Sequence, residues 1–466
     1  MEAVAKVAAT NIERTFFMYR LAGLVGEVRP NEREAQFISN MSTSHPLNPL
    51  YSKVLTVLLN VLLLAPVLSG ALLPPAEAAP RLPADPAEVL ERLPIRPGDT
   101  TARELAGLRA AVNRAAKEAP ADPLPATELA ARYYQLAIAR GDPRYIGYAD
   151  AVMAPFAKSQ APEVLVVRGQ LKQYRHDFDG ALADFAAALK ADPQFAAAHA
   201  WRGAIFLVQA NYPAAQAECE ALLALDRAVL HGGCIGLTRA YSGQLEAGYA
   251  ALQRALEQTR DPGNRLWLLT RLGEVAAWRG QAAKAEQHYR AALALEIEDG
   301  YLLAAWSDFL LDQQRPAEVV KLLANQEASD GLLLRLAIAE TALKLPLARA
   351  HVQALADRFA AAKVRGDTTH RAEEARFTLQ LAGNPAAAVA IAAANYQVQR
   401  EPRDARALLE AAVAARDAAA AQPVRDWLKS SGFEDARLRQ LGEASARAGA
   451  LAEVPPPPVV KPEGRP

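Results

Sequence analysis

The sequence predicts an all-α protein built as an α-solenoid of stacked helix hairpins, and three observations lead to this prediction. About a fifth of the residues are alanine, which has the highest helix propensity and lets helices pack closely. Hydrophobic residues make up 51% of the 466-residue chain, enough for a packed core. Small residues recur 34 positions apart, as at Gly169 and Gly203 or at Ala181 and Ala215. Such a period is typical of arrays in which each unit packs on the next.

The charges of the chain balance, with 52 Lys and Arg residues against 52 Asp and Glu residues. Proteins that bind nucleic acid usually carry an excess of basic residues, because these neutralise the phosphates. We therefore expect no nucleic-acid partner. Composition alone does not name a substrate.

Residues 54–73 form a charge-free apolar run that stands apart from the rest of the chain. A lysine precedes the run, and Ala76 and Ala78 follow it with the small-x-small spacing of a signal-peptidase site. The sequence therefore predicts a signal peptide over 41–78, cut between Ala78 and Ala79, and export to the periplasm or beyond.

The position of this apolar run leaves alternatives open. Signal peptides normally lie within about 15–30 residues of the chain start. Translation from Met41 would satisfy this rule, and 1–40 would then be a mis-called upstream extension or a cytoplasmic tail. Alternatively, 54–73 is retained as a transmembrane helix, since it is just long enough to span a bilayer, and the protein is anchored in the inner membrane.

The rest of the chain divides by composition and periodicity. Residues 79–100 are rich in proline and are expected to form a linker. Apolar residues recur at three- and four-residue spacing over 101–119, as in a single amphipathic helix. Eight or nine repeat units follow over 124–430, and an amphipathic capping helix over 431–452. The proline-rich tail 453–466 is expected to be disordered.

The clearest repeat unit spans 268–295. Leu272 and Gly273 in its first half, with Ala285 and Tyr289 in its second, have the spacing of a tetratricopeptide repeat, and the sequence resembles that family. The resemblance implies a right-handed superhelix of helix hairpins, with small residues where the two helices of a hairpin touch. The residues that define the repeats are Gly169, Ala181, Phe185, Gly203, Ala215, Gly236, Gly273, Ala285 and Tyr289.

In tetratricopeptide repeat proteins the first helix of each unit lines an inner face that usually binds peptides, and the resemblance implies such a face here. The residues that would form it are aromatic and weakly acidic, which suits an extended apolar or mixed segment anchored by tryptophan and tyrosine. Alternatively, half of the aromatic residues belong to the core. The candidates are Gln170, Gln173, Tyr174, Leu207, Leu237, Tyr241, Trp267, Glu274, Trp278, Tyr301 and Asp308.

Cys219 and Cys234 are the two cysteines of the chain, and the repeat pattern places them on neighbouring helices. In the oxidising compartment that an exported protein enters, such a pair can form a disulfide. Alternatively, the two cysteines are buried small hydrophobic residues.

No segment of the sequence has the spacings typical of zinc proteases, serine hydrolases, phosphate-binding loops or paired-cysteine metal sites. We therefore expect no catalytic residue, no metal site and no cofactor. The sequence predicts an exported, periplasmic, non-catalytic scaffold that binds a protein or an extended peptide. The alternatives are an assembly factor anchored in the inner membrane by 54–73 and, less favoured, an envelope enzyme with a helical superstructure.

Overall fold

The computed structural model describes residues 98–452 of the chain. The predicted upstream extension, signal peptide, cleavage site, proline-rich tail and most of the linker lie outside the described residues. From Thr101 onward the described residues belong to one compact unit. None of the described helices combines the length and apolar character needed to cross a membrane.

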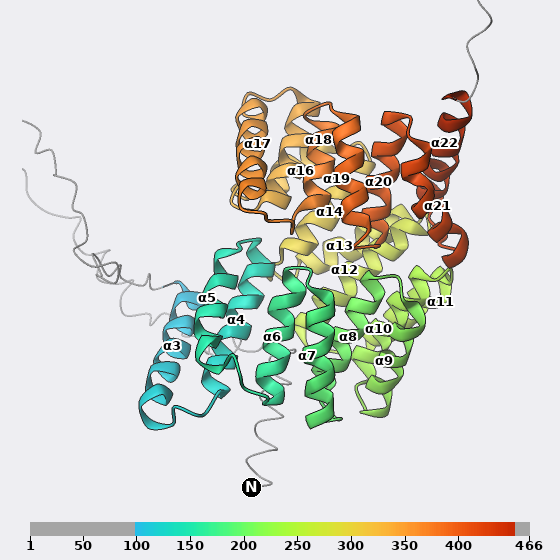
Figure 1. Ribbon diagram of the computed structural model, residues 1–466. Coiled ribbons are helices and arrows are strands. Elements are labelled where there is room, and N and C mark those ends of the chain that lie inside the picture. Colours follow the sequence, from blue (N-terminus) through green and yellow to red (C-terminus); the bar gives the residue numbers. More distant parts are fainter. Residues whose placement is uncertain (1–97, 453–466) are drawn as a thin grey trace, which may run out of the picture. The chain divides into compact units, whose positions relative to one another are not determined.

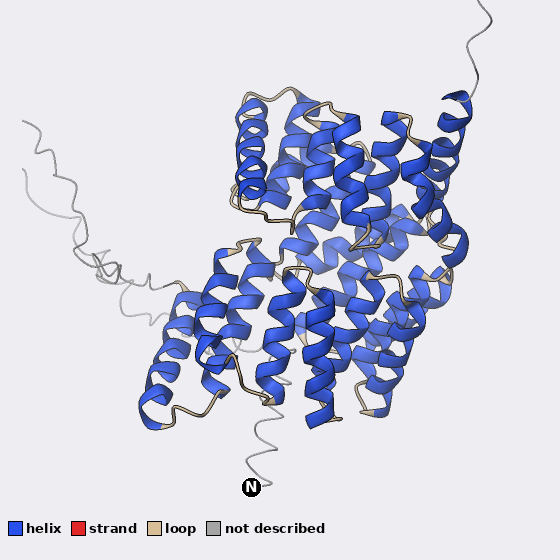
Figure 2. Cartoon of the chain, viewed as in Figure 1, coloured by secondary structure: helices blue, strands red, loops and turns tan. Residues whose placement is uncertain are grey.

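All regular secondary structure within 98–452 is helical, which confirms the predicted fold class (Figures 1 and 2). In this range α3 (Thr100–Glu118) comes first, nine helix hairpins follow, and α22 (Ala436–Ala452) comes last. The hairpins are α4 (Leu124–Arg140) with α5 (Arg144–Met153) and the short η2 (Ala154–Phe156), α6 (Pro162–Tyr174) with α7 (Phe178–Ala191), α8 (Ala196–Val208) with α9 (Tyr212–Ala224), α10 (Ala228–Tyr241) with α11 (Leu245–Glu257), α12 (Pro262–Trp278) with α13 (Ala282–Leu293), α14 (Gly300–Asp312) with α15 (Pro316–Leu322), α16 (Asp330–Leu343) with α17 (Ala348–Val364), α18 (Arg371–Gln380) with α19 (Pro385–Tyr396), and α20 (Pro402–Ala415) with α21 (Ala418–Ser431).

Within the hairpins, glycine in the first helix makes room for a large side chain of the second. A Cβ atom added at Gly169 would lie 2.5 Å from the ring of Phe185, and one added at Gly273 would lie 2.7 Å from the ring of Tyr289. Both rings are buried. These contacts explain why the repeat pattern pairs a glycine with an aromatic residue about 16 positions later, since only glycine lets the ring approach the helix backbone so closely.

Side chains with a carboxylate mark where several helices begin. Asp177 accepts a hydrogen bond from the backbone N of Gly180 (3.0 Å) before α7, and Asp299 accepts one from Leu302 (2.7 Å) before α14. These bonds satisfy N–H groups that have no partner within the helix. The local sequence therefore sets the start of these helices.

The C-terminal helix begins later than the sequence predicts. Helix α21 continues to Ser431, and Gly432, with a φ of 67°, ends it in the left-handed region. Asp435 then accepts a hydrogen bond from the backbone N of Leu438 (2.7 Å) and starts the new helix α22. The predicted capping helix is thus α22 from Ala436, preceded by a short turn.

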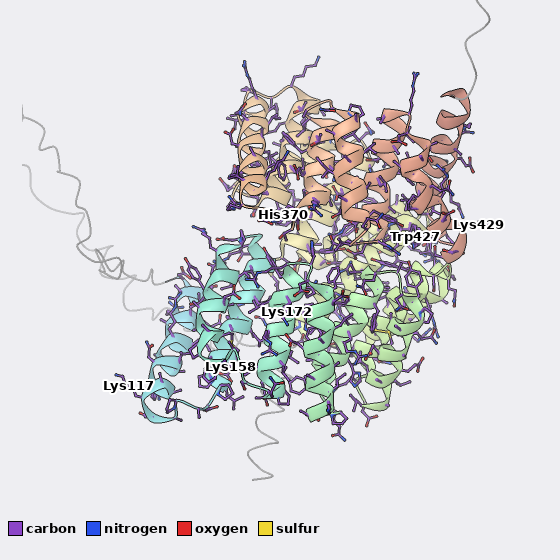
Figure 3. The ribbon with its side chains drawn as sticks, viewed as in Figure 1. Lys117, Lys158, Lys172, His370, Trp427 and Lys429 are labelled. Carbon is purple, nitrogen blue, oxygen red and sulfur yellow. A yellow bond between two sulfur atoms is a disulfide. The ribbon has the colours of Figure 1, made fainter. Side chains whose placement is uncertain are left out.

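Late helices of the array pack against early ones. The backbone N of Arg400 donates to the carbonyl of Val208 (2.8 Å), the indole N–H of Trp427 donates to the hydroxyl of Tyr212 (2.7 Å), and Glu434 accepts from the backbone N of Leu245 (2.9 Å). We call these three hydrogen bonds the closing contacts. In Figure 1 α20 and α21 lie in the upper half of the view and α8 to α11 in the lower half, and Figure 3 labels Trp427 between the two.

Gly243 lies in the turn between α10 and α11, next to the end of α21. Its φ of 79° is left-handed, and an added Cβ would lie 2.7 Å from the carbonyl oxygen of Ser431. A larger residue would therefore both strain the turn and push α21 away.

Cys219 on α9 and Cys234 on α10 form a disulfide, and their Cα atoms are 5.5 Å apart. Cys219 is fully buried. We expect titration of the denatured, unreduced protein to find no free thiol, and reduction to lower the stability by roughly 3 kcal/mol, the chain-entropy value for a loop of this length. Denaturation curves with and without reductant measure that loss. Two free thiols in the unreduced protein would contradict the disulfide.

Candidate binding site

The predicted inner-face residues separate into three groups in the structure. Gln170, Leu207, Leu237 and Tyr241 are buried. Tyr241 shows the reason, because its ring packs edge-on against Phe433, 6.3 Å between ring centroids. The C-terminal helices therefore cover part of the face that the resemblance assigns to a peptide.

Three further candidates pack against neighbouring helices. Gln173 accepts a hydrogen bond from the hydroxyl of Tyr134 (2.9 Å), and the ring of Tyr174 lies edge-on to the same tyrosine. The indole of Trp267 lies against the backbone of Gly233 on α10, where a Cβ atom would collide with it. These side chains stabilise the stacking of hairpins.

The other four candidates come together around a cavity of about 380 Å³. Glu274 and Trp278 belong to α12, and Tyr301 and Asp308 belong to α14. Helices α16, α20 and α22 and the turn before α22 close the opposite side. The additional residues that line the cavity are Ala277, Gly280, Ala282, Tyr289, Ala304, Ala305, Phe309, Asp312, Gln313, Arg335, Pro402, Arg403, Arg406, Asp435, Arg437 and Leu438.

Asp308 binds two arginines from later hairpins. Its carboxylate accepts from Arg335 on α16 (2.7 Å) and from Arg376 on α18 (2.5 Å). Burial on its own would raise the pKa of Asp308, but the two guanidinium charges outweigh it and hold this pKa well below its ordinary value. Asp308 is therefore a charged anchor for both helices.

Asp312, one helical turn further along α14, binds two more arginines. Arg406 on α20 donates two hydrogen bonds to it, both 2.7 Å long, and Arg437 on α22 also pairs with it. Glu410 accepts from both arginines as well, at 2.8 and 3.2 Å. We refer to Asp308 and Asp312 together as the aspartate hub.

The aspartate hub ties α14 to the helices α16, α18, α20 and α22. Each of these four helices contributes one arginine, and each arginine reaches the same face of α14. Residues four apart lie on one side of a helix, so two carboxylates suffice to gather all four. These ion pairs therefore hold the later hairpins against α14, where their helices form part of the cavity wall.

Glu274 has partners of its own. The hydroxyl of Tyr301 donates to one carboxylate oxygen (2.6 Å) and Arg271 donates to the other (2.9 Å). The guanidinium of Arg271 also lies over the ring of Tyr301, 4.2 Å from its centroid. Burial raises the pKa of Tyr301, so the phenol stays protonated and donates.

The other three arginines that line the cavity, Arg335, Arg406 and Arg437, pair with the aspartate hub, whereas Arg403 has a different partner. It donates to Glu401 at the start of its own helix (2.8 Å), and 51% of its side chain is exposed. Its guanidinium carbon lies 5.8 Å from the centroid of the Tyr301 ring. This arginine is half solvated at the wall of the cavity.

Trp278 also borders a second, more open groove of about 560 Å³. Its ring packs edge-on against Tyr241 and Phe433, at centroid distances of 5.6 and 5.4 Å. Trp278 therefore has one side in the core and another at the boundary of both spaces. The groove is lined in addition by Leu245, Glu246, Ala277, Arg279, Gly280, Gln281, Glu434, Asp435, Ala436, Arg437 and Arg439.

The described residues contain no group of three or more His, Cys, Asp or Glu side chains placed to hold a metal ion. The carboxylates around the cavity instead accept hydrogen bonds from arginine, tyrosine and backbone donors. In this structure these carboxylates neutralise the charges of the arginines that are buried with them.

The sequence analysis named Asp308 as an inner-face candidate, but it named neither Asp312 nor the arginines that both aspartates bind. The signal available was the spacing of the two aspartates, four residues apart on one predicted helix. The arginines gave no such signal, because they lie between 27 and 125 positions later in the chain.

No protein-family model and no curated protein matches this chain. Solved structures of repeat proteins do. A tetratricopeptide repeat protein from Parabacteroides merdae is 14% identical over 51% of this chain and 93% of its own, with a TM-score of 0.39. The human IFIT1 dimer with m7Gppp-AAAA is 15% identical over 76% and 86%, with a TM-score of 0.40. The tetratricopeptide domain of P58(IPK) is 13% identical over 76% and 100%, with a TM-score of 0.22. Each of these three similarities has an identity of 15% or less and a TM-score of 0.40 or less.

Proposed function

We propose that the chain is an exported, non-catalytic scaffold that binds a protein or an extended peptide in the groove beside Trp278. The observation that carries this proposal is the position of the two tryptophans predicted for the inner face. Trp278 borders open space on two sides, whereas Trp267 packs against the backbone of Gly233. A large aromatic side chain at the edge of a groove is a typical anchor for a partner.

The rim of the groove supports a partner of mixed character. The groove is lined by three carboxylates and three arginines, so neither sign of charge dominates; they are Glu246, Glu434, Asp435, Arg279, Arg437 and Arg439. Such a surface suits a protein segment with both apolar and polar residues. The balanced charge of the whole chain likewise favours a protein over a nucleic acid.

Affinity purification from the envelope fraction tests the groove. We expect Trp278→Ala to lose the co-purifying partner, because the side chain contributes to the groove. The substitution also removes the ring contacts with Tyr241 and Phe433, so circular dichroism and a melting curve are used to establish that the variant is folded. Trp267→Ala is the matched control: it removes the same side chain from a packing site and is expected to lower the melting temperature but retain the partner. Quantitative mass spectrometry compares the two. Equal recovery of the partner with both variants would contradict the assignment.

Export is the second part of the proposal and rests on the apolar run 54–73 and the alanines that follow it. N-terminal sequencing of the protein from its native host tests this part. A chain that begins at Ala79 supports cleavage and a periplasmic protein. A chain that begins at Met1 or Met41 contradicts cleavage and supports the membrane-anchored assembly factor.

A further inference from the structure

The cavity between α12, α14 and α20 has the dimensions of a site for a small molecule. Its volume of about 380 Å³ lies within the range of roughly 300–1,000 Å³ that is typical of ligand pockets. The space exists because Ala277, Ala304 and Ala305 are small where α12 and α14 face inward. Trp278 adds an aromatic wall beside these alanines. The cavity therefore has an apolar wall formed by α12 and α14.

The carboxylates that line the cavity are already engaged. Glu274 accepts from Tyr301 and Arg271, and each aspartate of the hub pairs with two arginines. Asp435 accepts from the backbone at the start of α22. A cationic ligand would have to displace one of these donors before it could pair with a carboxylate, which would leave a buried arginine without its partner.

An anionic ligand can pair with Arg403 without displacing any of these donors. A guanidinium has five N–H groups, and Arg403 directs one hydrogen bond to Glu401 and exposes half of its side chain. The planar guanidinium can hold a carboxylate through two parallel hydrogen bonds. A ligand carboxylate can thus bind without breaking an ion pair of the hub.

We propose that this cavity binds a small monocarboxylate with an apolar body. The carboxylate pairs with Arg403, and the apolar part lies against Trp278 and the alanine wall. A single negative charge fits better than the two charges of a phosphate monoester, because Arg335, Arg406 and Arg437 are already paired with the aspartate hub, which leaves Arg403 to balance one charge. The cavity shares Trp278 with the proposed partner groove, but Arg403, which would hold the carboxylate, lines the cavity and not the groove.

Calorimetric titration of the full chain with N-acetyl-L-leucine tests the proposal. We expect saturable binding of this acid, and binding at least tenfold weaker for N-acetyl-L-leucinamide, which differs only in lacking the charge. Isopentyl phosphate, which carries a second charge, is expected to bind more weakly than the acid. The titration extends to ~10 mM of the acid, which corresponds to about 3 kcal/mol of binding free energy. Equal affinity for the acid and the amide, or no saturable binding of the acid within this range, would overturn the proposal.

Substitutions of the cavity locate the ligand. Arg403→Gln is expected to weaken binding of N-acetyl-L-leucine at least tenfold, and Arg403→Lys to weaken it less, because lysine keeps the charge but not the planar fork. Ala304→Leu fills the cavity without changing any charge and is expected to abolish binding. Arg144→Gln is the matched control on α5, which contributes no residue to the cavity, and it should bind as the unaltered chain does. Unchanged affinity in both Arg403→Gln and a folded Ala304→Leu would overturn the proposal.

A peptide that ends in leucine and a free carboxylate tests whether the ligand is a small molecule or the C-terminus of a partner protein. Acetyl-Ala-Ala-Leu carries the apolar residue and the carboxylate of N-acetyl-L-leucine at the end of a longer chain. If the cavity takes a small molecule, the tripeptide binds no better than the single residue. Much tighter binding of the tripeptide would overturn the small-molecule assignment and identify the end of a partner chain as the ligand. Arg403 and Ala304 line the cavity but are not among the residues that line the partner groove. Arg403→Gln is therefore expected to keep the co-purifying partner while it loses the small acid, so the two proposals can fail separately.

Discussion

Replacing Asp308 with asparagine is expected to destabilise the protein by about 3 kcal/mol, since removing one partner of a buried ion pair leaves the other charge uncompensated. Asparagine keeps the shape of aspartate but not its charge. Arg335 and Arg376 would then face each other without a carboxylate between them. Arg335 is 7% exposed and cannot turn into solvent. Chemical denaturation followed by circular dichroism measures the loss.

Asp150→Asn provides the control for this substitution. Asp150 pairs with Arg175, but both side chains are more than two-fifths exposed, at 44% and 45%. Exposed ion pairs contribute less than about 1 kcal/mol, so this variant should unfold almost as the unaltered chain does. Similar losses for the two variants would show that the aspartate hub contributes no more than a surface pair.

The effect of Asp308 should also depend on pH. The two arginines hold its pKa in the folded protein below the ordinary value of 3.8. A carboxylate whose pKa is depressed by folding stabilises the protein fully above its unfolded pKa, and this contribution declines as the pH falls below about 4. The difference in stability between the unaltered chain and Asp308→Asn is therefore largest near neutral pH and shrinks below pH 4. A difference that stays constant down to pH 2 would contradict the assignment.

Gly273→Leu is expected to destabilise the array by about 3 kcal/mol, the upper end of the usual range for overpacking, because the added side chain displaces its neighbours in the core. Even the first added atom has no space, since a Cβ atom would lie 2.7 Å from the buried ring of Tyr289. Gly273→Ala should therefore also destabilise, although the same change in an open helix stabilises by up to about 1 kcal/mol. Thermal or chemical unfolding measures both variants.

Two other glycines calibrate this prediction. Gly147 lies within α5 with no atom within 4 Å of an added Cβ, so Gly147→Ala should stabilise slightly. At Gly203 an added Cβ would lie 3.3 Å from the sulfur of Cys234, a tight contact but not a collision. Gly203→Leu should thus destabilise the array, but less than Gly273→Leu. The repeat period alone predicts the same loss of stability for leucine at Gly203 and at Gly273. Identical melting curves for the two leucine variants would therefore contradict the prediction that is based on the packing around each glycine.

The sequence predicts the hairpins well because their determinants are local. Gly169 and Phe185 are 16 positions apart, and a repeat pattern records such spacings directly. The same holds for the aspartates that begin helices. Each of these features depends on residues within one or two turns of a helix or within one hairpin.

The candidate site could be predicted only in part, because its geometry depends on how far the array curves. Tyr241 occupies an inner-face position in the repeat pattern, but Phe433 covers it from the far end of the array. The curvature that brings these residues together accumulates over many hairpins. It depends on ion pairs such as that of Asp312 with Arg437, 125 positions apart, which no local spacing reveals.

The closing contacts also change how this array should unfold. In an open repeat array each unit touches only its neighbours, so the ends can unravel one unit at a time. Here Trp427 is bound to Tyr212, 215 positions earlier, and the last hairpins cannot peel away without uncovering the middle of the chain. The array should therefore lose its structure in one concerted transition and fold slowly for a helical protein, because contacts between distant residues form late.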